Sequence, residues 1–517
     1  MHSSRWGARF LALLAGAMAV ISQQPFSFPW ILALALPGMF WLWHSTNTPA
    51  RAFWVGWFAG LGYFSGTLHW IAEPFLVQPE IYGWMIPFAV SGMAGGMALF
   101  WGAGFWLAKR IGSNSWGAPF ALTFALVGME WLRGNILSGF PWSLLGYTWV
   151  DTDALLLAAD IGIYGLTLWT VLIGMMLGYI LVLRGGFRRI GYFVLVTLIF
   201  GLPFLHANLT STLISTFEKK GTGRVQTGPL IGLVQPNVAQ KDKWQPHLRE
   251  AHLQDLLDKT RQLSAEGADV VVWPEAATPY QLDKIPELQR IIGEALNPGA
   301  VLLAGAVRFE GEDAFNSLIA IGSDGTVLDI YDKQHLVPFG EMVPFEPLLS
   351  RLGLRTMIAL PGGFTSGAAR DRSMTVADLP TFVPMICYEA IFPAEIMRRA
   401  AKGEWLVQVT NDAWFGDWVG PYQHLAMARV RAVERGLPVA RSANTGVSAM
   451  IDAHGRMVSS LPLNEAGILL ERLPKKLPKT TYSRYEDIPF GLALLMTLLL
   501  AFFGNGRLRA SKPGHKV

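Results

Sequence analysis

Long apolar runs dominate the first two fifths of the chain, and one more follows near its end. Each clear run is long enough to cross a hydrocarbon core of roughly 30 Å. The six clear runs are residues 52–71, 82–108, 116–138, 160–183, 188–206 and 487–504. Two shorter runs, 10–22 and 28–43, are separated by Gln23, Gln24 and Pro25, which is typical of a tight helical pair. The pattern predicts eight membrane-spanning helices, seven of them within residues 1–206 and the eighth within residues 485–517.

The first apolar run also has features of a secretory signal peptide. Arg5 and Arg9 precede its apolar core, and small residues follow. A second apolar run comes at once, which favours a retained helix over a cleaved leader.

Lys and Arg occupy alternate short loops of this eight-helix arrangement. The loops 72–81 and 139–159 contain neither residue. The basic residues of the other side are Arg5, Arg9, Arg51, Lys109, Arg110, Arg184, Arg188, Arg189, Arg507, Arg509, Lys512 and Lys516. Because cytoplasmic loops are enriched in Lys and Arg, we expect both termini in the cytoplasm. Residues from about 207 to 486 are then expected outside it.

From residue 229 the pattern changes to short β-branched runs that alternate with segments of helical periodicity. The predicted strands are 232–236, 269–273, 300–308, a hairpin over 316–330, 381–387, 405–410 and strands within 438–452. The predicted helices are 247–265, 284–296, 393–401 and 422–436. This alternation predicts an α/β sandwich over residues 229–484, with residues 207–228 as a linker.

Composition narrows the class of protein. A mean hydropathy of +0.33 with 15% charged residues is too apolar for a wholly soluble chain of 517 residues. The formal charge of +4 is spread out, so no basic stripe predicts a nucleic-acid partner. A single cysteine excludes an internal disulfide and a cysteine-built zinc site. His335 and His424 lack metal-ligand spacing, so we expect neither a metal nor a cofactor.

The single cysteine, Cys387, ends an apolar predicted strand and is followed by Tyr388 and Glu389. In an extended segment residues two apart share a face, so we expect the thiol and the Glu389 carboxylate to point the same way. An unpaired thiol is costly to keep in an oxidising compartment, which favours a reactive residue. An inert buried thiol is the alternative.

Two other polar segments follow predicted strands. Glu275 comes after Trp273 and Pro274, and the segment DIYDKQHLVPFGE supplies Lys333 and Glu341. A thiolate nucleophile, a carboxylate base and an ammonium that favours the thiolate can together make an acyl-transfer site. Taken singly, each of the three charged residues has a structural alternative. Glu275 could be an acid at a helix start, Lys333 a solvated charge at a strand end, and Glu341 a loop carboxylate.

The sequence motifs around Glu275, Lys333 and Cys387 are more specific together than any one of these residues alone. WPE, DKxxLVPFGE and ICYE, in this order, resemble the carbon-nitrogen hydrolase (nitrilase) superfamily, and NDAWFG at 411–416 and MARVRAVE at 427–434 extend the resemblance. With apolar helices on both sides, the chain is similar to the apolipoprotein N-acyltransferase family. The resemblance implies an αββα sandwich. It also implies site residues, namely Glu275 as base, Lys333 as stabiliser, Cys387 as nucleophile, Glu341 as a further site carboxylate, and Trp244, Tyr388 and Glu389 as supporting or substrate-contacting residues.

The resemblance further implies a function. An acyl chain from a membrane phospholipid, typically phosphatidylethanolamine, would pass through a thioester on Cys387 to the α-amino group of an N-terminal diacylglyceryl-cysteine of apolipoproteins. We expect a monomer in the bacterial inner membrane with a periplasmic catalytic domain. The apolar loop 342–364 is a candidate lid, with ordinary core packing as its alternative. The rival hypotheses are a membrane-bound nitrilase-type amidase that hydrolyses a small amide, and a transporter or assembly factor with an inactive domain.

Overall fold

The computed structural model describes residues 5–112, 115–220, 228–344, 363–368 and 372–504. The chain forms two compact units. The first comprises Met1–Ala72, Trp84–Thr216 and Tyr485–Val517, and the second comprises Glu73–Gly83 and Phe217–Arg484. The segment predicted as a loop at 72–81 therefore forms two short helices, α4 (Glu73–Leu76) and α5 (Pro79–Tyr82), that belong to the second unit.

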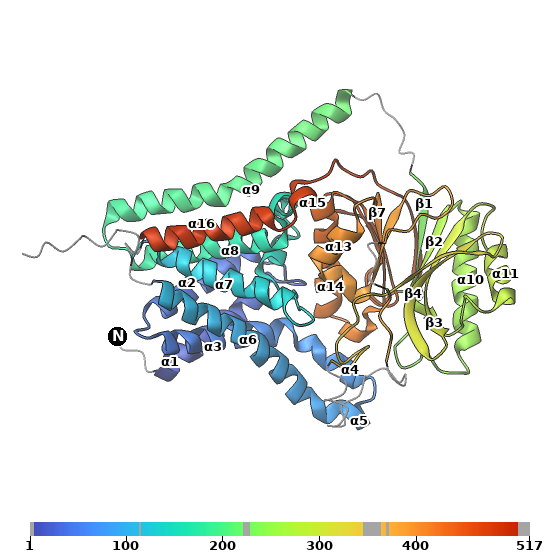
Figure 1. The fold of residues 1–517 in the computed structure, drawn as a ribbon, viewed down its shortest axis with the longest axis horizontal. Helices are drawn as coiled ribbons and strands as arrows, with labels where there is room; N and C mark the ends of the chain where they lie inside the picture. Colours follow the sequence, from blue (N-terminus) through green and yellow to red (C-terminus); the bar gives the residue numbers. More distant parts are fainter. Residues whose placement is uncertain (1–4, 113–114, 221–227, 345–362, 369–371, 505–517) are drawn as a thin grey trace, which may run out of the picture. The chain divides into compact units, whose positions relative to one another are not determined.

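The first unit is helical, and each apolar run lies mostly in helical segments (Figure 1). Its principal helices are α1 (Arg5–Ala19), α2 (Leu32–His44), α3 (Pro49–Thr67), α6 (Ile86–Ile111), α7 (Ala118–Asn135), α8 (Ala158–Val182), α9 (Gly186–Lys220) and α16 (Ile488–Gly504). By length and composition, three described stretches can cross a membrane, namely Pro79–Ile111, Asp153–Val182 and Gly186–Leu205. Trp6–Ser22 and Ile488–Gly504 are shorter apolar helices. The structure thus confirms several apolar helices but not the count of eight spans.

Helix α1 packs closely on α3. A Cβ atom on Gly16 would lie 1.9 Å from the Ala59 carbonyl oxygen, and one on Gly62 would lie 2.1 Å from that of Leu13. Such backbone contact through small residues is typical of helix packing in membranes. The close fit makes α1 an integral member of the helical unit.

Helix α9 is longer than the predicted span. It continues to Lys220, through residues expected to form a linker from 207 onward. No glycine or proline interrupts the chain between Pro203 and Gly221, so nothing in the sequence stops the helix there.

The second unit contains two sheets, each covered by helices on its outer face (Figure 1). The six-stranded sheet has the order β11 (Gly467–Arg472), β1 (Leu230–Gln235), β2 (Val270–Thr278), β3 (Val301–Glu310), β4 (Asp313–Gly322) and β5 (Val327–Asp332). The five-stranded sheet has the order β10 (Met457–Ser460), β9 (Ala449–Ile451), β8 (Val439–Ala443), β7 (Trp405–Thr410) and β6 (Phe382–Ile386). The predicted α/β sandwich is confirmed, whereas β10 and β11 are strands that the pattern did not predict.

The helices complete an αββα arrangement. In Figure 1, α10 (Arg249–Ala265) and α11 (Pro286–Glu294) flank the first sheet, and α13 (Pro393–Arg399) and α14 (Val419–Arg435) flank the second. The Ser442 hydroxyl joins the two sheets by donating to the carbonyl oxygens of Val234 and Val272, at 2.9 and 3.2 Å.

Parallel pairing brings several strand ends to one edge. Strands β6 and β7 run parallel with Ile386 opposite Val409, so the chain leaves both strands at the same level. The pairing of β2 with β3 shifts register between Trp273 and Thr278. Glu275 lies within this irregularity and not beyond the strand, because Pro274 has no N–H to donate to the ladder.

Candidate active site

Cys387 occupies a sharp turn at the end of β6. Its φ of +48° lies in the left-handed region, which non-glycine residues seldom adopt. The short helix η8 (Cys387–Ile391) begins here. The predicted extended conformation at Cys387 is therefore wrong, because the chain reverses direction at the cysteine itself.

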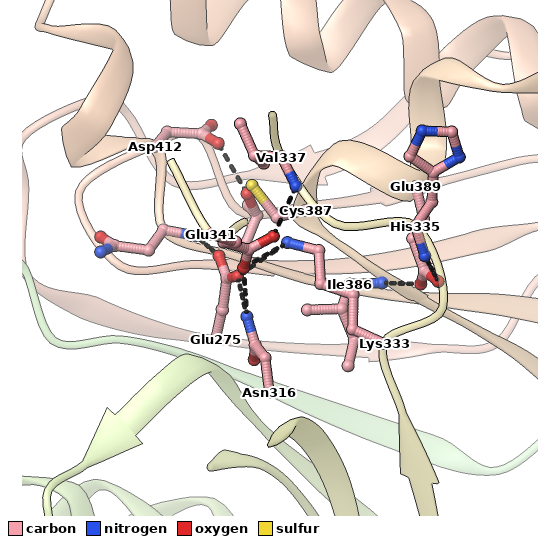
Figure 2. Close-up of polar contacts among 12 residues, drawn as sticks. Glu275, Asn316, Lys333, His335, Val337, Glu341, Ile386, Cys387, Glu389 and Asp412 are labelled. Atoms are coloured by element: carbon pink, nitrogen blue, oxygen red, sulfur yellow. Dashed lines mark hydrogen bonds and ion pairs between the residues drawn. The ribbon is translucent and has the colours of Figure 1, made fainter. Parts of the chain in front are cut away.

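The turn also overturns the expectation that Glu389 shares a face with the thiol. The Glu389 carboxylate accepts hydrogen bonds from the Ile386 and Gln334 N–H groups, at 2.8 and 2.9 Å, and from the Tyr331 hydroxyl at 2.6 Å. It also pairs with Arg399 at 3.2 Å. Figure 2 shows Glu389 set apart from Glu275, Glu341 and Cys387. Glu389 therefore stabilises the turn at Cys387 (a bracing role) and does not face the thiol.

Electrostatics agree with this bracing role. Burial alone would raise the pKa of Glu389, but Arg399 and the surrounding hydrogen bonds outweigh it and hold the pKa below its usual value. The carboxylate is therefore charged at neutral pH and is matched by a buried guanidinium.

Glu275, Lys333 and Glu341 form one buried cluster (Figure 2). The Lys333 ammonium lies 2.9 Å from Glu341 Oε1 and 3.5 Å from Glu275 Oε1. The Asn316 side-chain amide donates to the same two carboxylates, at 2.7 Å to Glu275 and 3.0 Å to Glu341. One ammonium and one amide thus hold both carboxylates in place.

The second oxygen of each carboxylate bonds to the backbone. Glu275 Oε2 accepts from the Asn411 N–H at 2.8 Å, and Glu341 Oε2 accepts from the Val337 N–H at 2.8 Å. Neither carboxylate can rotate without breaking these bonds. The cluster is therefore preorganised before any substrate arrives.

The thiol is weakly acidic in this setting. Burial raises the pKa of Cys387 well above its ordinary value, and Glu275 raises it further, while Lys333 and a hydrogen bond with Thr410 oppose the shift. The pKa of Lys333 is lowered by burial, but Glu341 and Glu275 outweigh this effect and raise it above its usual value. At neutral pH the thiol is protonated and Lys333 is charged, so a nucleophilic Cys387 needs a base.

Two further predicted residues lie at the margins. Tyr388 is buried, with its ring edge-on to His335 and Phe392 at centroid distances of 5.6 and 5.1 Å. Trp244 is 40% exposed. Its ring contacts the Lys243 ammonium, 5.8 Å from the ring centroid.

Sequence reasoning missed a buried network beneath the cysteine. The His424 ring lies 3.0 Å through Nε2 from the Cys387 carbonyl oxygen and 2.9 Å through Nδ1 from Asp412. Asp412 also pairs with Arg441 at 2.5 Å and accepts from the Thr410 hydroxyl at 2.8 Å. The motif NDAWFG carried a signal for Asp412, whereas no local pattern indicated Arg441. The network supports the backbone of the strained turn.

Burial would raise the pKa of Asp412, but Arg441 and His424 outweigh it and lower the pKa to about 2. Asn316 and Lys243 also belong to the site and were not predicted. Asn316 lies within strand β4 and Lys243 in an irregular turn, where periodicity carries no chemical signal.

Two other expectations concern metals and a lid. Among the described residues, no group of three or more His, Cys, Asp or Glu side chains could hold a metal ion. Residues 345–362 of the candidate lid lie outside the described residues.

Comparisons with known proteins cover both units. The profile of the family described as Carbon-nitrogen hydrolase matches residues 230–479, and that of the Apolipoprotein N-acyltransferase N-terminal domain matches residues 15–176. A protein of Brucella suis biovar 1 (strain 1330) named "Apolipoprotein N-acyltransferase" is 38% identical over 97% of this chain and 96% of its own. The chain belongs to the apolipoprotein N-acyltransferase family.

A second member of the apolipoprotein N-acyltransferase family, from Rhodopseudomonas palustris (strain ATCC BAA-98 / CGA009), is 34% identical over 98% of this chain and 96% of its own. Among solved structures, Saccharomyces cerevisiae Nit3, a member of branch 10 of the nitrilase superfamily, matches 52% of this chain and 97% of its own, with 19% identity and a TM-score of 0.37. Membership of the family supports an acyltransferase over the amidase and over a transporter with an inactive domain. It also supports a bacterial membrane protein.

Proposed function

We propose that the protein transfers an acyl chain from a membrane phospholipid, through a thioester on Cys387, to the α-amino group of the N-terminal diacylglyceryl-cysteine of apolipoproteins. The observation that carries this proposal is the buried cluster of Glu275, Lys333 and Cys387 in a chain of the apolipoprotein N-acyltransferase family. We take phosphatidylethanolamine as the donor.

In the first half-reaction Glu275 removes the thiol proton, and the thiolate attacks the ester carbonyl of the phospholipid. The tetrahedral intermediate carries a negative charge on oxygen, which the Lys333 ammonium is suited to stabilise. The C–O bond of the ester then breaks. The departing lysophospholipid oxygen takes the proton from Glu275, which leaves the acyl group on Cys387 as a thioester.

In the second half-reaction the α-amino group attacks the thioester carbonyl. Glu275 accepts a proton from the attacking nitrogen, the C–S bond breaks, and the proton passes to the sulfur. The products are an amide and the free thiol, so the enzyme returns to its starting state. The raised pKa of Cys387 favours recovery of the thiol.

Glu341 and Asn316 have a supporting role in this scheme. Both contact the groups that act, because Glu341 binds Lys333 at 2.9 Å and Asn316 binds Glu275 at 2.7 Å. They hold the ammonium and the base while charge moves between sulfur and oxygen. Trp244 and Tyr388 are proposed to contact or position substrate.

Both proposed substrates are lipids, which fits a catalytic domain tethered between apolar helices. We propose a monomer in the inner membrane, with the second unit periplasmic and both termini cytoplasmic. The distribution of Lys and Arg among the short loops supports this orientation.

Purified protein given phospholipid and a diacylated lipopeptide tests the function. The expected product is N-acylated lipopeptide together with lysophospholipid, in equal amounts. Free fatty acid without N-acylated peptide would instead support the hydrolase hypothesis.

A further inference from the structure

A second buried lysine lies beside the cluster. Lys243 belongs to the turn between β1 and α10 and is only 5% exposed. Its ammonium donates a hydrogen bond of 3.0 Å to the backbone carbonyl oxygen of Glu275. Lys241, two residues earlier in the same turn, is exposed. Of these two lysines, the turn therefore directs only Lys243 into the interior, toward Glu275.

The charges of the cluster explain why a second cation is useful. The carboxylates of Glu275 and Glu341 with the Lys333 ammonium sum to one negative charge. Nearby, Asp412 is already matched by Arg441. Moving the thiol proton to Glu275 keeps this sum, whereas losing it to solvent brings the sum to two negative charges. Buried negative charge without a partner is unfavourable, so a second cation lowers the cost of forming the thiolate.

We propose that Lys243 is a positioning residue that supplies the second ammonium of the active site, balancing its charge so that the Cys387 thiolate can form, while its hydrogen bond holds the Glu275 backbone. This inference rests on the proposed function, because it needs Cys387 as the nucleophile. The groups that face the thiol are Glu275 on β2, Lys333 after β5, Asp412 and Thr410 near the end of β7, and Tyr388 on η8.

The ionisation of Lys243 gives the inference a pH signature. Burial lowers the pKa of Lys243 to about 8, while Glu275 and Cys387 oppose this shift. Lys243 is therefore charged below about pH 8 and neutral above it. Because the thiol pKa is raised well above its usual value, Lys243 loses its proton first as the pH rises. Above about pH 8 the fraction of Cys387 in the thiolate form therefore no longer rises with pH.

Iodoacetamide alkylation of the full-length protein measures this directly, because alkylation needs the thiolate and the chain has one cysteine. The wild-type rate should rise about tenfold per pH unit and flatten above about pH 8. Lys243→Met should be roughly tenfold to thousandfold slower at pH 7 and should rise without the break, since a nearby charge shifts a pKa by about one to three units. Lys241→Met is the matched control and should retain the wild-type profile.

Lys243→Arg separates charge from folding. Its guanidinium stays charged, so alkylation at pH 7 should remain close to wild type and the break near pH 8 should disappear. The inference is overturned if Lys243→Met alkylates at the wild-type rate, or if Lys243→Arg keeps the break. The proposed function is tested separately by incubating wild-type protein with phospholipid. If no acyl adduct forms on Cys387, the proposed function fails whatever the alkylation profile shows.

Discussion

The bracing role of Glu389 leads to a prediction about the variant Glu389→Ala. The substitution removes a buried carboxylate that binds the backbone N–H groups of Ile386 and Gln334. It also leaves Arg399, whose side chain is 2% exposed, without its closest carboxylate. The turn at Cys387 then loses the hydrogen bonds and the ion pair that stabilise it.

Breaking a buried ion pair by removing one partner costs about 3–5 kcal/mol. Glu395 also lies 3.4 Å from Arg399 and offsets part of this loss, so we expect about 3 kcal/mol. For a unit of this size, that corresponds to a fall in melting temperature of roughly 5 °C. Acyl transfer should fall with it, because the strained backbone at Cys387 relaxes.

Thermal unfolding of the detergent-solubilised protein measures the change. Glu404→Ala is the matched control, because Glu404 pairs with Lys476 at an exposed site and should contribute at most about 1 kcal/mol. A Glu389→Ala protein with a native melting temperature and no acyl transfer would refute the bracing role and indicate that Glu389 acts in the chemistry.

Three other predictions follow from the site. Lys333→Met should abolish acyl transfer and destabilise the protein by about 3–5 kcal/mol, whereas adding Glu341→Gln should restore part of the melting temperature and none of the activity. Gly305→Ala should cost about 1–3 kcal/mol and lower activity, because its Cβ would lie 2.2 Å from the Pro274 carbonyl oxygen and 2.6 Å from the Cα atom of Glu275, the proposed base. The carboxylate of Asp412, with its pKa lowered to about 2, stabilises the fold above about pH 4 and loses this effect as the pH falls toward 2, so Asp412→Asn should flatten the acid limb of a stability profile.

Much of the fold was predictable because burial leaves a strong pattern. The strand at Val270–Thr278 and the helix at Arg249–Ala265 follow from apolar runs and helical spacing. Strand β10 was missed because Met457–Ser460 is mostly exposed and carries no apolar alternation. Strand β11 is a short edge strand whose pairing with β1 depends on residues far away in sequence.

The positions of the candidate site residues were predictable where a polar residue follows a strand end, as for Lys333 and Cys387. The conformation of Cys387 could not be predicted, because the local pattern of FVPMIC indicates an extended chain. Its turn depends on bonds from Glu389 to Gln334 and Arg399, which lie on other elements. Local patterns do not carry such tertiary constraints.

Mass spectrometry of the protein incubated with phospholipid alone tests whether Cys387 carries the acyl group. We expect one acyl chain attached to Cys387, released when a diacylated lipopeptide is added, and no adduct on Cys387→Ala. Cys387→Ser should acylate far more slowly, since a hydroxyl is a much weaker nucleophile at neutral pH. Transfer of the acyl chain to lipopeptide by Cys387→Ala, or a wild-type protein that transfers without ever carrying the acyl chain on Cys387, would rule out a thioester on Cys387.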